Sequence, residues 1–276
     1  FSICMYCSRF VETTDHCFTN YARIAELNLY DLQTDTYFSG TQTALSEELR
    51  TWAMGEAEAI SCMTYSRLRS FLVGISQEKS LPYDLETIEV DSFYYEVFTP
   101  QIVAGNWKIA SHTPNAVVLS QSTAIKIFGN VETAIGKQMT LTGRLFTSPE
   151  TTPETGGTVY TIQAVMEDIP LNNSFIFMAH VDVLTMNDSE GLLQSRKRHD
   201  LTGARTFVLL SPLAGKVDLE NQFRKRDYTY TLYNKEYTVV ANGIGGASRN
   251  EAAFIFGWVT GICLLYTSPS PRDRTR

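Results

Sequence analysis

Two histidine–aspartate pairs have the residue types that acid–base catalysis requires. His180 and Asp182 are separated by one residue, and His199 is followed directly by Asp200. A positioned histidine or carboxylate can transfer a proton in a transition state, so either pair could belong to a hydrolytic site. The first pair alternates with two valines, however, which is typical of a strand whose polar side faces solvent. We therefore expect it to be a surface feature.

The sequence has no motif that would give these residues a catalytic setting. It lacks the G-x-S-x-G nucleophile turn, the H-E-x-x-H zinc helix and the phosphate-binding and dinucleotide-binding glycine motifs. Glu167 and Asp168 add adjacent carboxylates without a partner motif, and the glycines at 243, 245 and 246 precede a strongly apolar run, which favours a flexible link. We predict no catalytic, cofactor-binding or metal-binding residue, and no enzyme.

The cysteines leave one metal hypothesis open. Cys4 and Cys7 have the C-x-x-C spacing of a zinc or redox site, and His16 and Cys17 follow nearby. A structural zinc needs four ligands and usually a second such pair, which the chain lacks. The favoured interpretation is that these are small apolar residues at the foot of a helix. The sequence does not decide the state of these cysteines or of Cys62.

Length and charge exclude several classes of protein. The chain has 276 residues, of which 43% are hydrophobic and 19% charged, which is the balance of a globular protein and not of a disordered or fibrous one. Its net charge is −7. No basic cluster is larger than 196–198, so nothing indicates binding to a polyphosphate backbone, and we expect no nucleic-acid partner.

Periodicity predicts a β-α-β beginning. Apolar residues alternate along 23–30, recur at helical spacing along 43–52, and lie within a β-rich run at 58–73. Further along the chain, we predict helices at 90–98, 122–128 and 217–223, and strands at 115–120, 136–141, 159–165, 206–210 and 237–240. Asp91 or Ser92 should cap the first of these helices, and Ser120 or Ser122 the second. The segment 142–158 should be an exposed loop.

The two ends have membrane-like composition. Residues 252–262 are apolar and uncharged, which predicts the start of a transmembrane helix. Residues 1–21 are expected to be the end of an earlier membrane helix followed by a juxtamembrane stalk. The run CLLYTSPSPRD at 263–273 resembles the translation of a sequencing adapter, so 263–276 is expected to be an artefact.

Five motifs occur in an order that resembles a known family. They are VDSFYYEVF at 90–98, IVAGNW at 102–107, PNAVVLSQSTAIKIFG at 114–129, AIGKQMTL at 134–141 and YTIQAVMEDIP at 160–170. In this order they resemble the MacB-like periplasmic core domain of FtsX-type ABC transporter permeases, in a version similar to those of the Bacteroides group. The resemblance extends more weakly over 22–250.

The resemblance implies an α+β fold with two subdomains. A discontinuous β-α-β porter-like subdomain would combine 23–73 with a returning piece near 204–244, and a second mixed subdomain would be inserted at about 88–200. Truncated transmembrane helices would flank the core at 22–250, since in the family one such helix precedes this domain and three follow it.

The resemblance also implies a mechanical function. The domain would lie on the periplasmic side of the bacterial inner membrane and transmit ATPase-driven motion to export or release a substrate. Expected partners are a cytoplasmic ABC ATPase, a second permease copy or a paired permease, the lipid bilayer and a possible periplasmic adaptor. ATP hydrolysis would take place on the separate ATPase, and no motif identifies the substrate. A soluble or anchored periplasmic binding module is the alternative.

Overall fold

The computed structural model describes residues 9, 13–41, 43–64, 67–76, 79–144, 157–173, 180–186, 204–232 and 235–244. Residues 1–8 and 10–12, the membrane segment predicted at 252–262, most of the predicted 142–158 loop, and the pair His199–Asp200 lie outside these residues. Within the described ranges, no helix has both the length and the hydropathy needed to cross a membrane.

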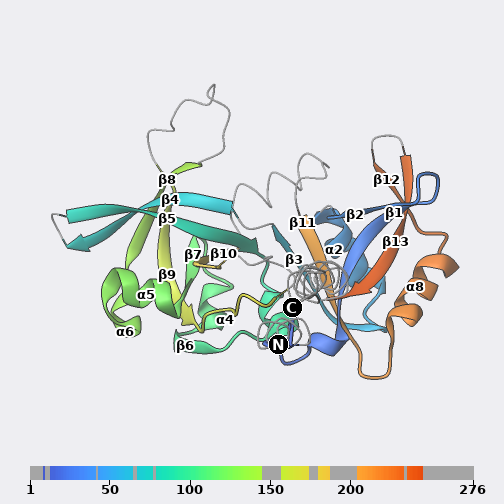
Figure 1. Cartoon of the computed structure of the whole chain (residues 1–276), viewed down its shortest axis with the longest axis horizontal. Helices are drawn as coiled ribbons and strands as arrows, with labels where there is room; N and C mark the ends of the chain where they lie inside the picture. The colour runs from blue at the N-terminus through green and yellow to red at the C-terminus, as the bar shows by residue number, and fades with distance from the viewer. Residues whose placement is uncertain are drawn as a thin grey trace, which may run out of the picture.

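The described chain forms two lobes, which Figure 1 shows on its right and left. In the first lobe, antiparallel strands follow the order β3-β11-β1-β13-β12, and β2 pairs with residues 28–31 of β1, directly beyond the stretch that pairs with β11. Its elements are η1 (Tyr21–Arg23), β1 (Ile24–Asp31), β2 (Thr36–Ser39), α2 (Thr43–Trp52), β3 (Ala57–Thr64), β11 (Ala204–Leu210), α8 (Lys216–Lys225), β12 (Thr229–Leu232) and β13 (Lys235–Gly243).

The two helices of the first lobe cover one apolar face of this sheet. Ala25, Leu27 and Leu29 of β1 are fully buried, as their alternation predicts, and they share a core cluster with Leu49 of α2 and Phe223 of α8. Burying such side chains stabilises a fold by roughly 1.5–3 kcal/mol each. The strand at 23–30 and the helix at 43–52 are therefore confirmed.

The second lobe is a closed arrangement of strands. Its order is β10-β7-β9-β8-β4-β5, and a parallel pairing of β10 with β5 joins the two ends of that order. Its elements are β4 (Arg67–Ser76), β5 (Lys79–Val90), β6 (Ile102–Gly105), α4 (Trp107–Ala110), β7 (Ala116–Ser120), α5 (Gln121–Phe128), α6 (Val131–Ala134), β8 (Gln138–Arg144), β9 (Val159–Met166) and β10 (Val183–Met186). The helix α3 (Tyr94–Phe98) follows β5 and packs against β3 and β11 of the first lobe.

Several sequence predictions need correction. The β-rich run at 58–73 is two strands, β3 and β4, which belong to different lobes. The strand β5 was not predicted, because Pro82 and the acidic residues around it obscure its alternation. The helix predicted at 90–98 begins only at Tyr94, and its N-cap residue, Phe93, makes no side-chain cap. Asp91 accepts a hydrogen bond from the Phe93 N–H, but its carboxylate also bonds to Ser61 and to the Cys62 N–H of β3. The cap at Ser120 is confirmed: its hydroxyl accepts a hydrogen bond from the Thr123 N–H.

A glycine is required where β6 turns into α4. Gly105 has a φ of +75°, and a Cβ added there would lie 2.2 Å from the Gln163 carbonyl oxygen. We expect Gly105→Ala to lower the free energy of unfolding by about 2–4 kcal/mol, because the cost of a left-handed backbone for alanine and the cost of overpacking against Gln163 are summed. Gly129→Ala is the matched control, since φ there is +78° with nothing within 4 Å. Urea unfolding measures both variants. If Gly105→Ala and Gly129→Ala lowered the free energy of unfolding equally, the close approach to Gln163 would not be what requires glycine at 105.

Candidate functional site

The two lobes meet where β5 leaves the second lobe and reaches β3 of the first. Val90, the last residue of β5, pairs with Met63, and this is the one registered pair between β3 and β5 in the described ranges. A single backbone pair is a weak attachment for two lobes, so side chains must stabilise it. We refer to this region, consisting of the end of β5, Asp91 and α3, as the joint (Figure 1).

The Asp91 carboxylate is the polar centre of the joint. Its Oδ1 accepts hydrogen bonds from Ser61 Oγ at 2.8 Å and from the Phe93 N–H at 3.2 Å, and its Oδ2 accepts one from the Cys62 N–H at 2.9 Å. Arg50 Nη2 of α2 forms an ion pair with the same Oδ2. The residue that follows β5 is thereby fixed to both α2 and β3 of the first lobe.

This carboxylate is almost fully removed from water. Asp91 is 5% exposed, and its burial raises the pKa of the carboxyl group, while the positive charge of Arg50 opposes that rise. Arg50 is itself held in place, because its Nε and Nη2 both donate to the Ile60 carbonyl oxygen and its guanidinium lies 4.0 Å from the centre of the Phe93 ring. These contacts hold the Arg50 guanidinium and the Asp91 carboxylate in one position, as a charged pair.

A second buried ion pair lies beside the joint. Arg69 of β4 pairs with Glu89 of β5, and the two side chains are 4% and 1% exposed. The Glu89 N–H donates to Thr64 Oγ1, at the end of β3, at 3.0 Å. The strand β5 is therefore also attached to β3 at Glu89, two residues before Asp91.

Aromatic side chains form the apolar half of the joint. Phe98 of α3 packs at a ring-centre distance of 5.1 Å against Phe207 of β11 and against Phe18, which precedes β1. Tyr94 lies on the same face of α3, with its ring centre 4.9 Å from that of Phe98, and it stacks on Trp107 of the second lobe at 5.7 Å. One continuous cluster of buried residues thus includes side chains from both lobes and from α3. Such packing transmits displacement, because close-packed interiors have low compressibility.

The residues considered for catalysis that lie in the described ranges do not assemble into a site there. His180 is exposed. Asp182 is half-buried instead of solvated, because its carboxylate accepts hydrogen bonds from the Glu86 N–H at 2.9 Å and from Thr123 Oγ1 at 2.7 Å. Asp168 accepts one from the Ser122 N–H at the start of α5. Asp182 and Asp168 are therefore used in structural contacts within the second lobe.

Metal-ligating side chains are also dispersed. Over the ranges that the structure describes, no group of three or more His, Cys, Asp or Glu residues could hold a metal ion. Cys17 is exposed and Cys62 is buried on β3. The predicted C-x-x-C pair lies outside the described residues, so its state remains a matter of sequence alone.

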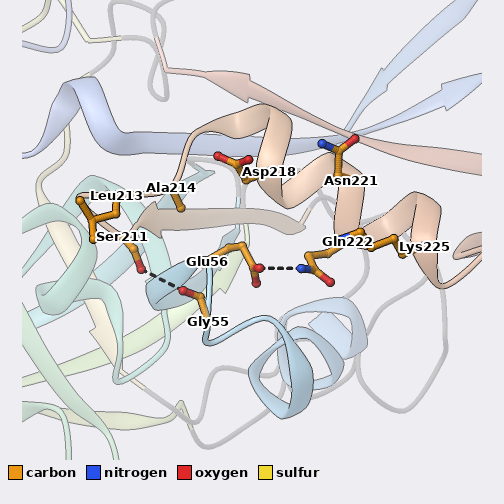
Figure 2. A pocket seen from close by; sticks show the side chains of 9 residues that line it. All are labelled: Gly55, Glu56, Ser211, Leu213, Ala214, Asp218, Asn221, Gln222 and Lys225. Carbon is orange, nitrogen blue, oxygen red and sulfur yellow. Dashed lines mark hydrogen bonds between the residues drawn. The ribbon is translucent and has the colours of Figure 1, made fainter.

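A shallow polar groove of about 360 Å³ lies on the first lobe, between the turn before β3 and helix α8. Figure 2 shows Gln222 pointing to Glu56, with Nε2 donating to Oε1 at 2.6 Å, and Ser211 Oγ donating to the Gly55 carbonyl. Asp218 accepts a hydrogen bond from the Gly215 N–H at 2.7 Å. The two carboxylates that line the groove, those of Glu56 and Asp218, thus hold α8 and the neighbouring turns together.

Known proteins resemble this chain in sequence and in fold. The family model for the MacB-like periplasmic core domain matches residues 15–226. A domain of a putative permease protein from Porphyromonas gingivalis has a TM-score of 0.59 and 18% identity, covering 82% of this chain and 92% of its own. The periplasmic region of MacB from Actinobacillus actinomycetemcomitans has a TM-score of 0.52 and 11% identity, covering 86% and 94%. No match is found among curated proteins.

Proposed function

The chain belongs to the family of MacB-like periplasmic core domains of ABC transporter permeases, and from this premise we propose that it transmits ATPase-driven motion to a substrate outside the inner membrane. The family is a permease component of ABC transporters, and the activity that we propose for this chain is mechanical. ATP would be bound and hydrolysed by a separate cytoplasmic subunit.

The observation that carries this proposal is the joint. A transmitting domain must move without absorbing the movement internally, which requires packed elements between the point of input and the point of output. The buried Asp91–Arg50 pair and the aromatic cluster around Phe98 provide that between the lobes. At the joint the Ser61 hydroxyl donates to the Asp91 carboxylate, but the two residues are 0% and 5% exposed, so a substrate could not reach them, which favours motion over chemistry.

We propose the following organisation around this core. The end of one membrane helix and a juxtamembrane stalk within 1–21, and the start of another membrane helix at 251–262, would attach the domain to the bilayer, and 263–276 would not belong to the fold. The pairing of β4 with β8 supports starting the inserted subdomain near residue 65, earlier than the 88 expected from the sequence. The remaining proposed partners are a second permease copy or paired permease and a possible periplasmic adaptor.

Movement of the domain relative to the bilayer tests the proposal. A fluorophore on Glu132→Cys, on the exposed side of α6, would report its approach to a quencher attached to lipid headgroups. In proteoliposomes that contain the full-length permease and its ATPase, we expect ATP to change the quenching. An ATPase variant that binds but does not hydrolyse ATP should prevent repeated cycles. Quenching that ignores ATP in an actively hydrolysing complex would contradict the proposal.

The polar groove on the first lobe favours the alternative, a periplasmic binding module. Groove and joint lie on different elements, so the two functions are separable. A module would bind its ligand equally well with the ATPase absent, whereas a transmitting domain would show nucleotide-dependent movement. Lys225→Ala in the groove should leave that movement unchanged if the first proposal holds.

A further inference from the structure

The segment that precedes β1 is attached to both lobes. We call residues 13–23 the stalk segment. At its far end, Arg23 donates to the Leu210 carbonyl oxygen at 2.7 Å and to Glu58 Oε2 at 2.9 Å, both in the first lobe. The segment leads directly into β1, so its connection to the first lobe is covalent as well. Figure 1 shows this blue segment at the base of the joint.

Its near end is bonded to the second lobe. Asn172 Nδ2 donates to the Thr13 carbonyl oxygen at 3.1 Å and to Thr13 Oγ1 at 3.0 Å, while the Asp15 N–H donates to the Asn172 carbonyl oxygen at 2.9 Å. We call these three residues the clasp. Asp15 is fully buried and has a φ of +67°, a conformation that is uncommon outside glycine and persists only where its surroundings impose it.

A short, well-anchored link connects the clasp to the sheet of the second lobe. Only five residues separate Met166, the end of β9, from Asn172. Within that link, the Glu167 N–H donates to the Gln101 carbonyl oxygen at 2.8 Å, and Asp168 accepts from Ser122 at 2.9 Å. Ile169 is buried in the cluster that spans the joint. A displacement of Asn172 would therefore displace β9 and not merely a loop.

We infer that the clasp is a second attachment, through which the stalk segment positions the second lobe directly. This inference rests on the proposed function. The joint alone would leave the second lobe attached at one place, about which it could rotate when the first lobe is moved. The clasp adds a second attachment, between the stalk segment and the link that follows β9, and restrains that rotation. Asn172 is thus a positioning residue for transmission, and it contacts neither substrate nor nucleotide.

The test compares ATP-driven movement of the two lobes. Separate fluorophores on Glu132→Cys in the second lobe and Lys225→Cys in the first would each report on a lipid-attached quencher, in the full-length permease with its ATPase. All other cysteines except the buried Cys62 would be replaced by serine. In Asn172→Ala we expect the response at 132 to fall by at least half, while the response at 225 stays within about a tenth of the unmodified protein.

Controls separate this inference from folding and from the proposed function. Asn221→Ala removes the same amide from α8 and should leave both responses unchanged, and Thr13→Ser, which keeps the hydroxyl and the carbonyl, should retain the response at 132. If Asn172→Ala does not fold, Thr13→Val, which removes one acceptor, replaces it. Absence of any response in the unmodified protein would overturn the proposed function. A normal response at 132 in Asn172→Ala would overturn the clasp alone.

Discussion

Replacing Asp91 with alanine is expected to lower the free energy of unfolding by about 3–5 kcal/mol, the range for removing one partner of a buried ion pair. The substitution leaves the Arg50 guanidinium without its carboxylate and removes the acceptor for Ser61 Oγ and for two backbone N–H groups. Urea unfolding of this chain, followed by circular dichroism, measures the loss. The loss for Asp91→Asn should be smaller than that for Asp91→Ala but still measurable, because an amide oxygen can still accept hydrogen bonds but carries no charge to pair with Arg50.

Glu58→Ala is the matched control for this prediction. Glu58 also pairs with an arginine, Arg23, at 2.9 Å, but the two side chains are 41% and 31% exposed. Exposed pairs of this kind contribute about 0–1 kcal/mol. If Asp91→Ala cost no more than Glu58→Ala, the carboxylate would not be what holds the joint.

Truncation of Phe98 should have an effect of similar size on the apolar half of the joint. Phe98 is 1% exposed and contacts aromatic rings from α3, from β11 and from the stalk segment. Phe98→Ala leaves a cavity that these neighbours can only partly fill, so we expect a loss of about 3–5 kcal/mol. Because the cavity lies between the lobes, the cooperative unfolding transition should also broaden or separate into two.

Phe128→Ala provides the comparison within a single lobe. Phe128 is the last residue of α5 and only partly buried at the rim of the second-lobe core. Its truncation should cost clearly less than that of Phe98 and should leave a single transition. Two transitions in Phe128→Ala, or one unchanged transition in Phe98→Ala, would argue against a joint at α3.

The sequence predicts those elements whose cause is local. Alternation along 23–30 and helical spacing along 43–52 identify β1 and α2, and the cap at Ser120 with the stop at Gly129 identifies α5. The motif order from 90 to 170 predicts the family correctly. For each element the signal lies within about ten neighbouring residues, and for the family it is the order of five such short motifs.

The joint could not be predicted, because its partners are distant in sequence. Arg50 and Ser61 lie 41 and 30 residues from Asp91, and a helix cap is the obvious local use for an aspartate before an aromatic helix. The division of 58–73 between two lobes has no local signal either. The clasp joins Thr13 to Asn172, which are 159 residues apart, and no pattern near either residue in the sequence indicates this contact.

The distance between the two lobes tests the central claim most directly. Spin labels on Glu132→Cys and Lys225→Cys, in the full-length permease with its ATPase, would give that distance by pulsed electron resonance with and without ATP. We expect a single narrow distribution that nucleotide does not change, because the joint and the clasp make the lobes move together. A second distance that appears with ATP would show that the lobes hinge, and would contradict transmission by one stiff body.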